Sequence, residues 1–81
     1  MPRRSDDAYE HTLGGKLRAA RHQAGLSQSA LETRSGVPKA RLSRYENNHV
    51  VPSLRLFVQL CSALRITPGS ILDGPDAPRL T

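Results

Sequence analysis

The sequence predicts a small all-α domain built from five short helices. Apolar residues in the middle of the chain recur at spacings of three and four, which is the period of a helix that packs on one face. The 81 residues include two Tyr, one Phe and no Trp, so the core must consist mainly of Leu, Ile, Val and Ala. Such a core suits packed helices better than sheets, and no segment shows the strict alternation of a strand.

The domain is expected to occupy residues 10–72, between flexible tails at residues 1–9 and 73–81. A chain of this length forms one domain. Its core would supply so little surplus stability that association of subunits would help. In the second tail, Gly74, Pro75 and Pro78 oppose a continued helix.

The first helix is predicted from about Glu10 to Ala24, and Gly25, which is free to adopt the left-handed conformation, would end it. The second helix would begin after the N-cap Ser27 and run to about Ser35. One face of the first helix is apolar and comprises Tyr9, Leu13, Leu17, Ala20 and Ala24.

The third helix is predicted from about Lys39 to Asn47, after Pro38, whose missing N–H costs nothing at a helix start. The fourth would follow the N-cap Ser53 and end at Leu64, and a short fifth helix would begin at Pro68. The side chains expected to face the core are Leu54, Phe57, Leu60, Cys61 and Leu64 in the fourth helix and Ile71 and Leu72 in the fifth.

The charge of the chain is unevenly distributed. Twelve Lys and Arg against seven Asp and Glu give a net charge of +5. Between His11 and Leu72 the only acids are Glu32 and Glu46, so the excess of cations is concentrated in the predicted domain. A basic middle with acidic ends favours a polyanion as partner, although charge that only maintains solubility explains the composition equally well.

Other features exclude several classes of protein. The single cysteine, Cys61, excludes an intramolecular disulfide and fits a reducing compartment. No apolar run approaches the roughly 18 residues of a membrane span, and no signal peptide is evident, so a cytoplasmic protein without membrane contact is expected. Because His11, His22 and His49 lack metal-ligand spacing and no catalytic motif occurs, we expect no metal, no cofactor and no enzymatic activity.

The third predicted helix has two chemically different faces. At 100° per residue, Leu42 and Tyr45 share one face with Pro38. Arg and Lys can donate to guanine O6 and N7, and an Ala methyl group can contact the thymine methyl. An ordinary solvated face is the alternative interpretation. The residues on the face opposite Leu42 are Lys39, Ala40, Ser43, Arg44 and Asn47.

The turn before this helix is typical of a helix-turn-helix. Gly36 permits the tight bend that such a motif needs, and Val37 can fill the gap between the two helices. The N-terminus of the second helix offers free N–H groups to a DNA phosphate, and Gln28 would donate to the same phosphate. The alternative is that Gln28 is a plain exposed residue.

Several short segments occur in a characteristic order between Leu13 and Leu72. They are Leu17-Arg18-Ala19-Ala20-Arg21, Gly25-Leu26-Ser27-Gln28, Leu31, Gly36-Val37, Leu42-Ser43-Arg44-Tyr45-Glu46-Asn47, Pro52-Ser53-Leu54, Leu64-Arg65-Ile66 and Ile71-Leu72. Their combination resembles the Cro/phage-repressor (XRE-type) family of helix-turn-helix DNA-binding domains. The resemblance implies a compact five-helix lambda-repressor-like domain whose second and third helices form the helix-turn-helix. It further implies a two-fold dimer on operator DNA, with the third helix in the major groove.

The same resemblance implies roles for individual residues. An ion pair between Arg21 and Glu46 would tie the first helix to the third and orient the Arg toward phosphate; an exposed, unimportant pair is the alternative. The positions that would read bases are Lys39, Ala40, Ser43 and Arg44. The positions that would contact phosphates are Gln28, Arg21, Asn47, His49 and Arg41.

Three residues depart from the family pattern. Glu32 replaces a small residue in the second helix, so its carboxylate must tilt into solvent or pair with a cation. Pro38 replaces the usual Ser or Thr cap and offers no hydroxyl to a phosphate. Asn48 replaces a common Gly, and Asn tolerates the left-handed conformation.

The sequence therefore predicts a sequence-specific transcriptional regulator, a repressor that acts as a homodimer on double-stranded DNA. Leu72 and the exposed side of the fifth helix are candidate dimer contacts. The alternatives are a restriction–modification controller, an antitoxin that binds a toxin protein and represses its own operon, and an interaction module that kept the fold but lost DNA binding.

Overall fold

The computed structural model describes residues 8–72, and every regular element within that range is a helix. A helical turn covers residues 8–10, so the expected count of five helices omits this turn. The segment predicted as one helix is thus divided, because Thr12 accepts a hydrogen bond from the Gly15 N–H at 3.0 Å and caps a new helix. The longer helices are α2 (Leu13–Gln23), α3 (Gln28–Ser35), α4 (Lys39–Glu46), α5 (Leu54–Leu64) and α6 (Pro68–Leu72).

The predicted helix ends are mostly confirmed. The hydroxyl of Ser27 accepts from the Ala30 N–H at 3.0 Å and caps α3, and Ser53 caps α5 in the same way. Gly25 and Gly36 adopt φ values of 73° and 79°, the left-handed conformation that ends a helix without strain. α5 ends at Leu64, as predicted, but its C-cap is Arg65, a non-glycine residue with a φ of 60°, which the sequence did not indicate.

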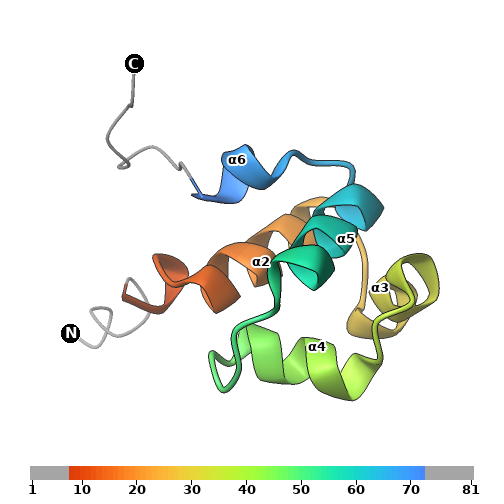
Figure 1. Ribbon diagram of the computed structural model, residues 1–81, viewed down its shortest axis with the longest axis horizontal. Helices are drawn as coiled ribbons and strands as arrows, with labels where there is room; N and C mark the ends of the chain where they lie inside the picture. Colours follow the sequence, from red (N-terminus) through yellow and green to blue (C-terminus); the bar gives the residue numbers. More distant parts are fainter. Residues whose placement is uncertain (1–7, 73–81) are drawn as a thin grey trace.

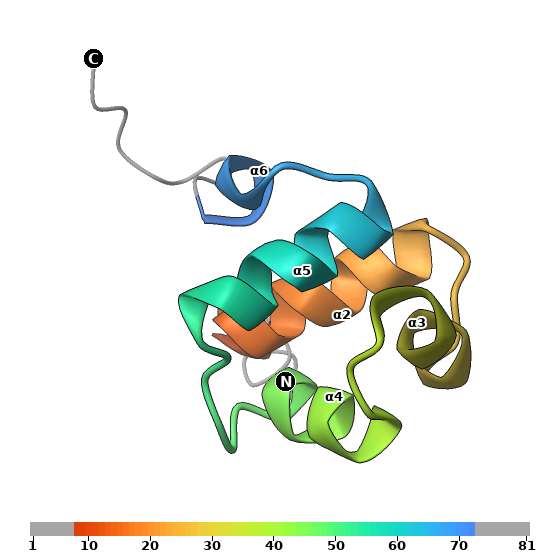
Figure 2. The same cartoon turned by 45° about the vertical axis from the view of Figure 1, so that its right-hand side comes forward.

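α2 and α5 form the middle of the molecule, with α3 and α4 to one side and α6 to the opposite side (Figures 1 and 2). The core lies between the helices, and every helix from α2 to α6 contributes at least one buried side chain to it. Its buried members are Leu17, Leu31, Val37, Leu42, Tyr45, Phe57, Leu60, Cys61, Leu64 and Ile71.

Three residues expected inside the core lie at the surface. Leu54 is 75% exposed and Leu72 is 58% exposed, and Ala24 is exposed at the C-cap of α2. The helical period gives the direction of a side chain but not whether another element covers it, and no helix in residues 8–72 covers Leu54 in the first turn of α5. Ile71 and Leu72 are adjacent and point about 100° apart, so the short α6 can bury only one of them.

The ordered domain begins before the expected boundary at residue 10. Ala8 and Tyr9, placed in the expected N-terminal tail, are helical, and Tyr9 is half-buried. The remainder of that tail and the expected tail at residues 73–81 lie outside the described residues.

Candidate nucleic-acid interface

α3 and α4 are joined by a tight turn at residues 36–38. Val37 is almost fully buried beneath the turn, as expected, and its N–H donates to the Ser35 hydroxyl at 3.1 Å. The Gln59 side chain of α5 donates to the Ser35 carbonyl at 2.6 Å. Pro38 precedes α4 without a side-chain cap and is exposed, although the sequence placed it on the apolar face. The turn is therefore held by a hydrogen bond within it and by a second one from α5.

α4 separates its apolar and polar side chains as predicted. Leu42 and Tyr45 are buried and hold the helix against the core. Within residues 8–72 no carboxylate forms an ion pair with Lys39, Arg41 or Arg44, so these three cations are available to an anionic partner. The exposed residues of α4 and its C-cap are Lys39, Ala40, Arg41, Arg44 and Asn47, and Ser43 is half-buried among them.

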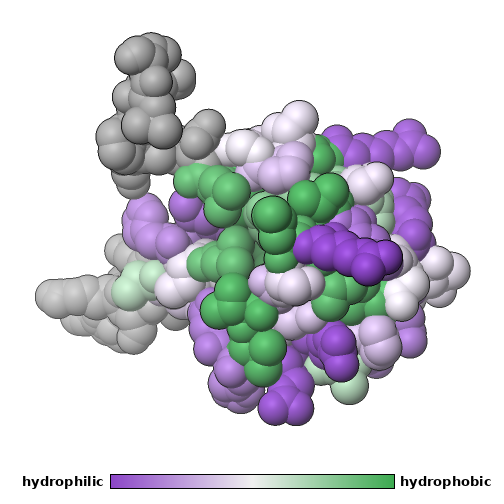
Figure 3. All heavy atoms as spheres, in the orientation of Figure 1, coloured by the Kyte–Doolittle hydropathy of each residue, from purple (hydrophilic) through white to green (hydrophobic). Residues whose placement is uncertain are grey.

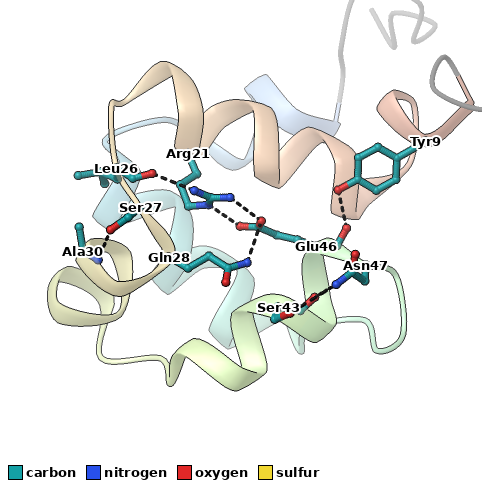
Figure 4. Close-up of polar contacts among 9 residues, drawn as sticks. All are labelled: Tyr9, Arg21, Leu26, Ser27, Gln28, Ala30, Ser43, Glu46 and Asn47. Atoms are coloured by element: carbon teal, nitrogen blue, oxygen red, sulfur yellow. Dashed lines mark hydrogen bonds and ion pairs between the residues drawn. The ribbon is translucent and has the colours of Figure 1, made fainter. Parts of the chain in front are cut away.

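The end of α4 is partly occupied by local hydrogen bonds. The Asn47 amide donates to the Ser43 carbonyl at 2.9 Å and to the Ser43 hydroxyl at 3.4 Å, so its N–H₂ group folds back on the helix (Figure 4). His49 is exposed, and its backbone N–H donates to the Arg44 carbonyl at 2.9 Å. A phosphate at this end can therefore meet the His49 ring directly, whereas the Asn47 amide must first leave Ser43.

Arg21 of α2 and Glu46 of α4 form a buried, two-pronged ion pair. The Arg21 Nε lies 2.8 Å from one Glu46 carboxylate oxygen, and Nη2 lies 2.9 Å from the other. Nη1 donates to the Leu26 carbonyl at 2.9 Å. The hydrogen bond to Glu46 raises the pKa of the Arg21 guanidinium, so the side chain remains charged despite its burial.

Gln28 joins this pair from the first turn of α3. Its side-chain nitrogen donates to the Glu46 carboxylate at 3.2 Å, and Figure 4 shows Arg21 and Gln28 converging on Glu46 from different helices. Arg21 is only 7% exposed, which leaves little of its surface for a phosphate. Gln28 is half-buried, so its side chain is more accessible to a partner than that of Arg21.

A second set of contacts joins α4 to the start of α2, and sequence reasoning missed it. The Tyr9 hydroxyl donates to the Glu46 carbonyl at 2.7 Å. The Asn48 amide oxygen accepts from the Gly14 N–H at 2.9 Å, and its nitrogen donates to the Thr12 hydroxyl at 2.9 Å. Two adjacent glycines at the start of a helix were the available signal, because a helical glycine often marks a close approach.

The departures from the family pattern are accommodated simply. Glu32 is exposed and forms no ion pair with another described residue, so its carboxylate tilts into solvent. Asn48 adopts a φ of 60°, the left-handed conformation expected of it.

Neither a metal-binding cluster nor a membrane-spanning helix is found in residues 8–72. No group of three or more His, Cys, Asp or Glu side chains gathers there to hold a metal ion. None of the helices in that range combines the length and apolar character needed to cross a membrane. The only described cysteine, Cys61, is buried, and its burial raises the pKa of the thiol.

Residues 12–71 match the model of a helix-turn-helix domain family. The match covers α2 to α5 completely and α6 as far as Ile71, so the ion pair and the exposed face of α4 both lie inside it. Neither the curated proteins nor the solved structures that were searched gave a match.

Proposed function

Because the chain belongs to this helix-turn-helix domain family, which is of the XRE/Cro type, we propose that it is a sequence-specific regulator of transcription that binds double-stranded operator DNA. α3 and α4 form the helix-turn-helix, and α4 enters the major groove. The observation that carries the proposal is the exposed face of α4. Its cations have no carboxylate partner in the described chain, while its opposite face is held in the core by Leu42 and Tyr45.

The face of α4 has donors suited to base edges. Lys39 and Arg44 donate to guanine, the Ala40 methyl contacts thymine, and Ser43 can bond to several bases. Phosphates on either side are contacted by Gln28, His49 and other residues at the rim of the helix-turn-helix. These contacts set the position of the protein on the duplex and carry no sequence information. The other proposed phosphate contacts are Asn47 and Arg41. Arg21, which is 7% exposed, supports this surface by holding Glu46.

The protein acts as a repressor and as a homodimer in this proposal. A domain that occupies a stretch of duplex represses transcription by excluding other proteins from that stretch. Two copies related by a two-fold axis read two half-sites, so the operator is palindromic. The activity requires neither a cofactor nor a metal.

The proposal is tested by titrating the protein into a labelled random-sequence duplex at increasing salt and following fluorescence anisotropy. Phosphate contacts release counterions, so log K should fall with log salt with a slope of about −0.9 for each neutralised phosphate. Arg41→Ala removes an exposed, proposed phosphate contact and should bind this duplex less well than the wild type. Arg34→Ala is the control: it removes the same charge from an exposed position of α3, outside α4, and should bind nearly as well as the wild type. Affinity that does not change with salt would contradict the proposal.

A further inference from the structure

A polar hollow of about 380 Å³ lies between the C-terminal ends of α3 and α5. In Figures 1 and 2, the C-terminal end of α5 lies above α3, and α4 lies below α3. The hydrogen bond from the Gln59 side chain to the Ser35 carbonyl joins the two helices at this place. The hollow is thus built on a fixed part of the fold, away from the exposed face of α4. The residues that line it are Arg34, Ser35, Gln59, Ser62, Ala63 and Arg65.

The hollow contains two cations that have no partner in the described chain. Arg34 and Arg65 are both exposed. Neither side chain forms an ion pair, a hydrogen bond or a ring contact with another residue in the range 8–72. A guanidinium group presents a rigid fork of N–H donors that matches a carboxylate, and arginine is enriched where proteins meet. The two side chains are therefore available to an anionic partner outside the DNA-binding face.

The backbone at Arg65 would be better served by glycine. Arg65 is the C-cap of α5 and has a φ of 60°, a conformation that costs free energy for a residue with a Cβ atom. Gly36 occupies the corresponding position after α3 without this cost. A cation suits the C-terminal end of a helix, but that interaction is small at an exposed position. Because strained backbone conformations concentrate at functional sites, the Arg65 side chain is the feature to explain.

We propose that the hollow binds an acidic segment of a second protein, whose carboxylates pair with Arg34 and Arg65. Pockets for free small molecules enclose most of the ligand in largely apolar walls. This hollow is instead polar, and four of its six lining residues are exposed. Carboxylates that project from another chain need no such enclosure, because that chain already holds them in place. Since the lining comes from α3 and α5, the acidic partner and DNA can bind at the same time.

The test compares two double variants that remove the same charge from different surfaces. Arg34→Gln with Arg65→Gln removes both guanidinium groups of the hollow. Arg41→Gln with Arg44→Gln removes two from the exposed face of α4 and is the matched control. The probes are a fluorescein-labelled hexaglutamate peptide and a labelled random-sequence duplex, both followed by fluorescence anisotropy. The measurements are made at physiological salt, where charges more than about 8 Å apart are largely screened.

The two double variants should show opposite losses. The hollow variant should lose about tenfold or more in affinity for hexaglutamate, because charge-assisted contacts to two arginines are removed. It should bind the duplex as the wild type does. The control should bind hexaglutamate as the wild type does and bind the duplex less well. Hexaglutamate should also bind the wild type that is already saturated with duplex.

Four results would overturn the inference. They are a wild type that does not bind hexaglutamate, an equal loss of peptide affinity in both double variants, a loss of duplex affinity in the hollow variant, and displacement of the peptide by free glutamate at the same carboxylate concentration. The third result would assign the hollow to DNA, and the fourth would assign it to a small anion. None of them bears on binding of DNA by α4.

A single substitution separates the role of the Arg65 side chain from its effect on the backbone. Arg65→Gly relieves the strain at the end of α5, so it should melt at or above the temperature of the wild type. It should nevertheless bind hexaglutamate less well than the wild type. An unchanged peptide affinity for Arg65→Gly would show that the Arg65 side chain does not contact the acidic segment and would overturn the inference.

Discussion

The Gly14 N–H donates to the Asn48 side-chain oxygen across 2.9 Å and so joins the first turn of α2 to the residue pair that follows α4. A Cβ atom at position 14 would lie only 2.5 Å from the Tyr45 carbonyl oxygen, so this approach requires glycine. Position 48 instead requires a side chain, because its amide oxygen accepts this hydrogen bond. Asn provides it and also tolerates the left-handed backbone of this residue. The end of the proposed DNA-binding helix is thus held by residues 34 positions away in the chain.

Asn48→Gly should lower the free energy of unfolding by about 1–3 kcal/mol. Glycine keeps the left-handed backbone but removes the hydrogen bonds to Gly14 and Thr12, each of which contributes about 0.5–1.5 kcal/mol. Asn48→Ala removes the same bonds and adds strain at a φ of 60°, so it should be less stable than Asn48→Gly. Urea denaturation of the three proteins checks this order, and a wild-type stability for Asn48→Gly would show that the side-chain bonds contribute nothing.

Glu46→Leu should destabilise the protein by about 3–5 kcal/mol, because it leaves the Arg21 guanidinium buried without its partner. Adding Arg21→Met removes the orphaned charge, so the double variant should recover most of the loss. Both variants should bind DNA less well, since Gln28 also depends on the Glu46 carboxylate for its orientation. Equal melting temperatures for wild type and Glu46→Leu would show that the ion pair does not support the fold.

Arg44→Ala should weaken binding to the preferred duplex by about 1–3 kcal/mol and relax the preference at one base pair. Gln28→Ala is the contrasting variant, because loss of a phosphate contact weakens preferred and random duplexes by the same factor. Competition binding with duplexes altered at single positions separates the two outcomes. An equal loss on both kinds of duplex for Arg44→Ala would assign Arg44 to phosphate instead of a base.

Deprotonation of the Cys61 thiol should lower the free energy of unfolding in alkaline solution. Burial raises the pKa of this thiol above its ordinary value of 9.0, so the folded state keeps the proton after the unfolded chain has lost it. The contribution of the protonated Cys61 thiol to stability is complete below about pH 9 and is lost progressively as the pH rises through the folded-state pKa. Cys61→Ala should be less stable at neutral pH but show a shallower decline above about pH 9. Parallel declines in the two proteins would contradict this origin.

The elements that sequence reasoning predicted well depend on local chemistry. Ser27 and Ser53 cap helices, and Gly25 and Gly36 end them, because each effect involves only the neighbouring turn. The separation of faces on α4 followed from the helical period, which is also local. These local features were enough to predict where α3 and α4 lie in the chain and which residues form the candidate surface.

The elements that it missed depend on contacts between distant segments. The helical period placed Leu54 and Leu72 inside, but their exposure depends on which helix lies over them. The contacts of Tyr9 and Gly14 with the end of α4 span more than 30 residues. The adjacent glycines Gly14 and Gly15 indicate a close approach but do not identify the segment that approaches. The partnership of Arg21 and Glu46 came from the family resemblance, because spacing alone does not bring two side chains of α2 and α4 together.

Selection of bound sites from a randomised duplex library tests the central claim most directly, namely that the exposed face of α4 reads a DNA sequence. The wild type should enrich a palindromic site whose half-sites are about 10–10.5 base pairs apart, centre to centre, or a multiple of that spacing. Selection with Arg44→Ala should recover the same site with one position per half-site relaxed. Wild-type selection that enriches no site, or an identical site from Arg44→Ala and the wild type, would contradict the claim.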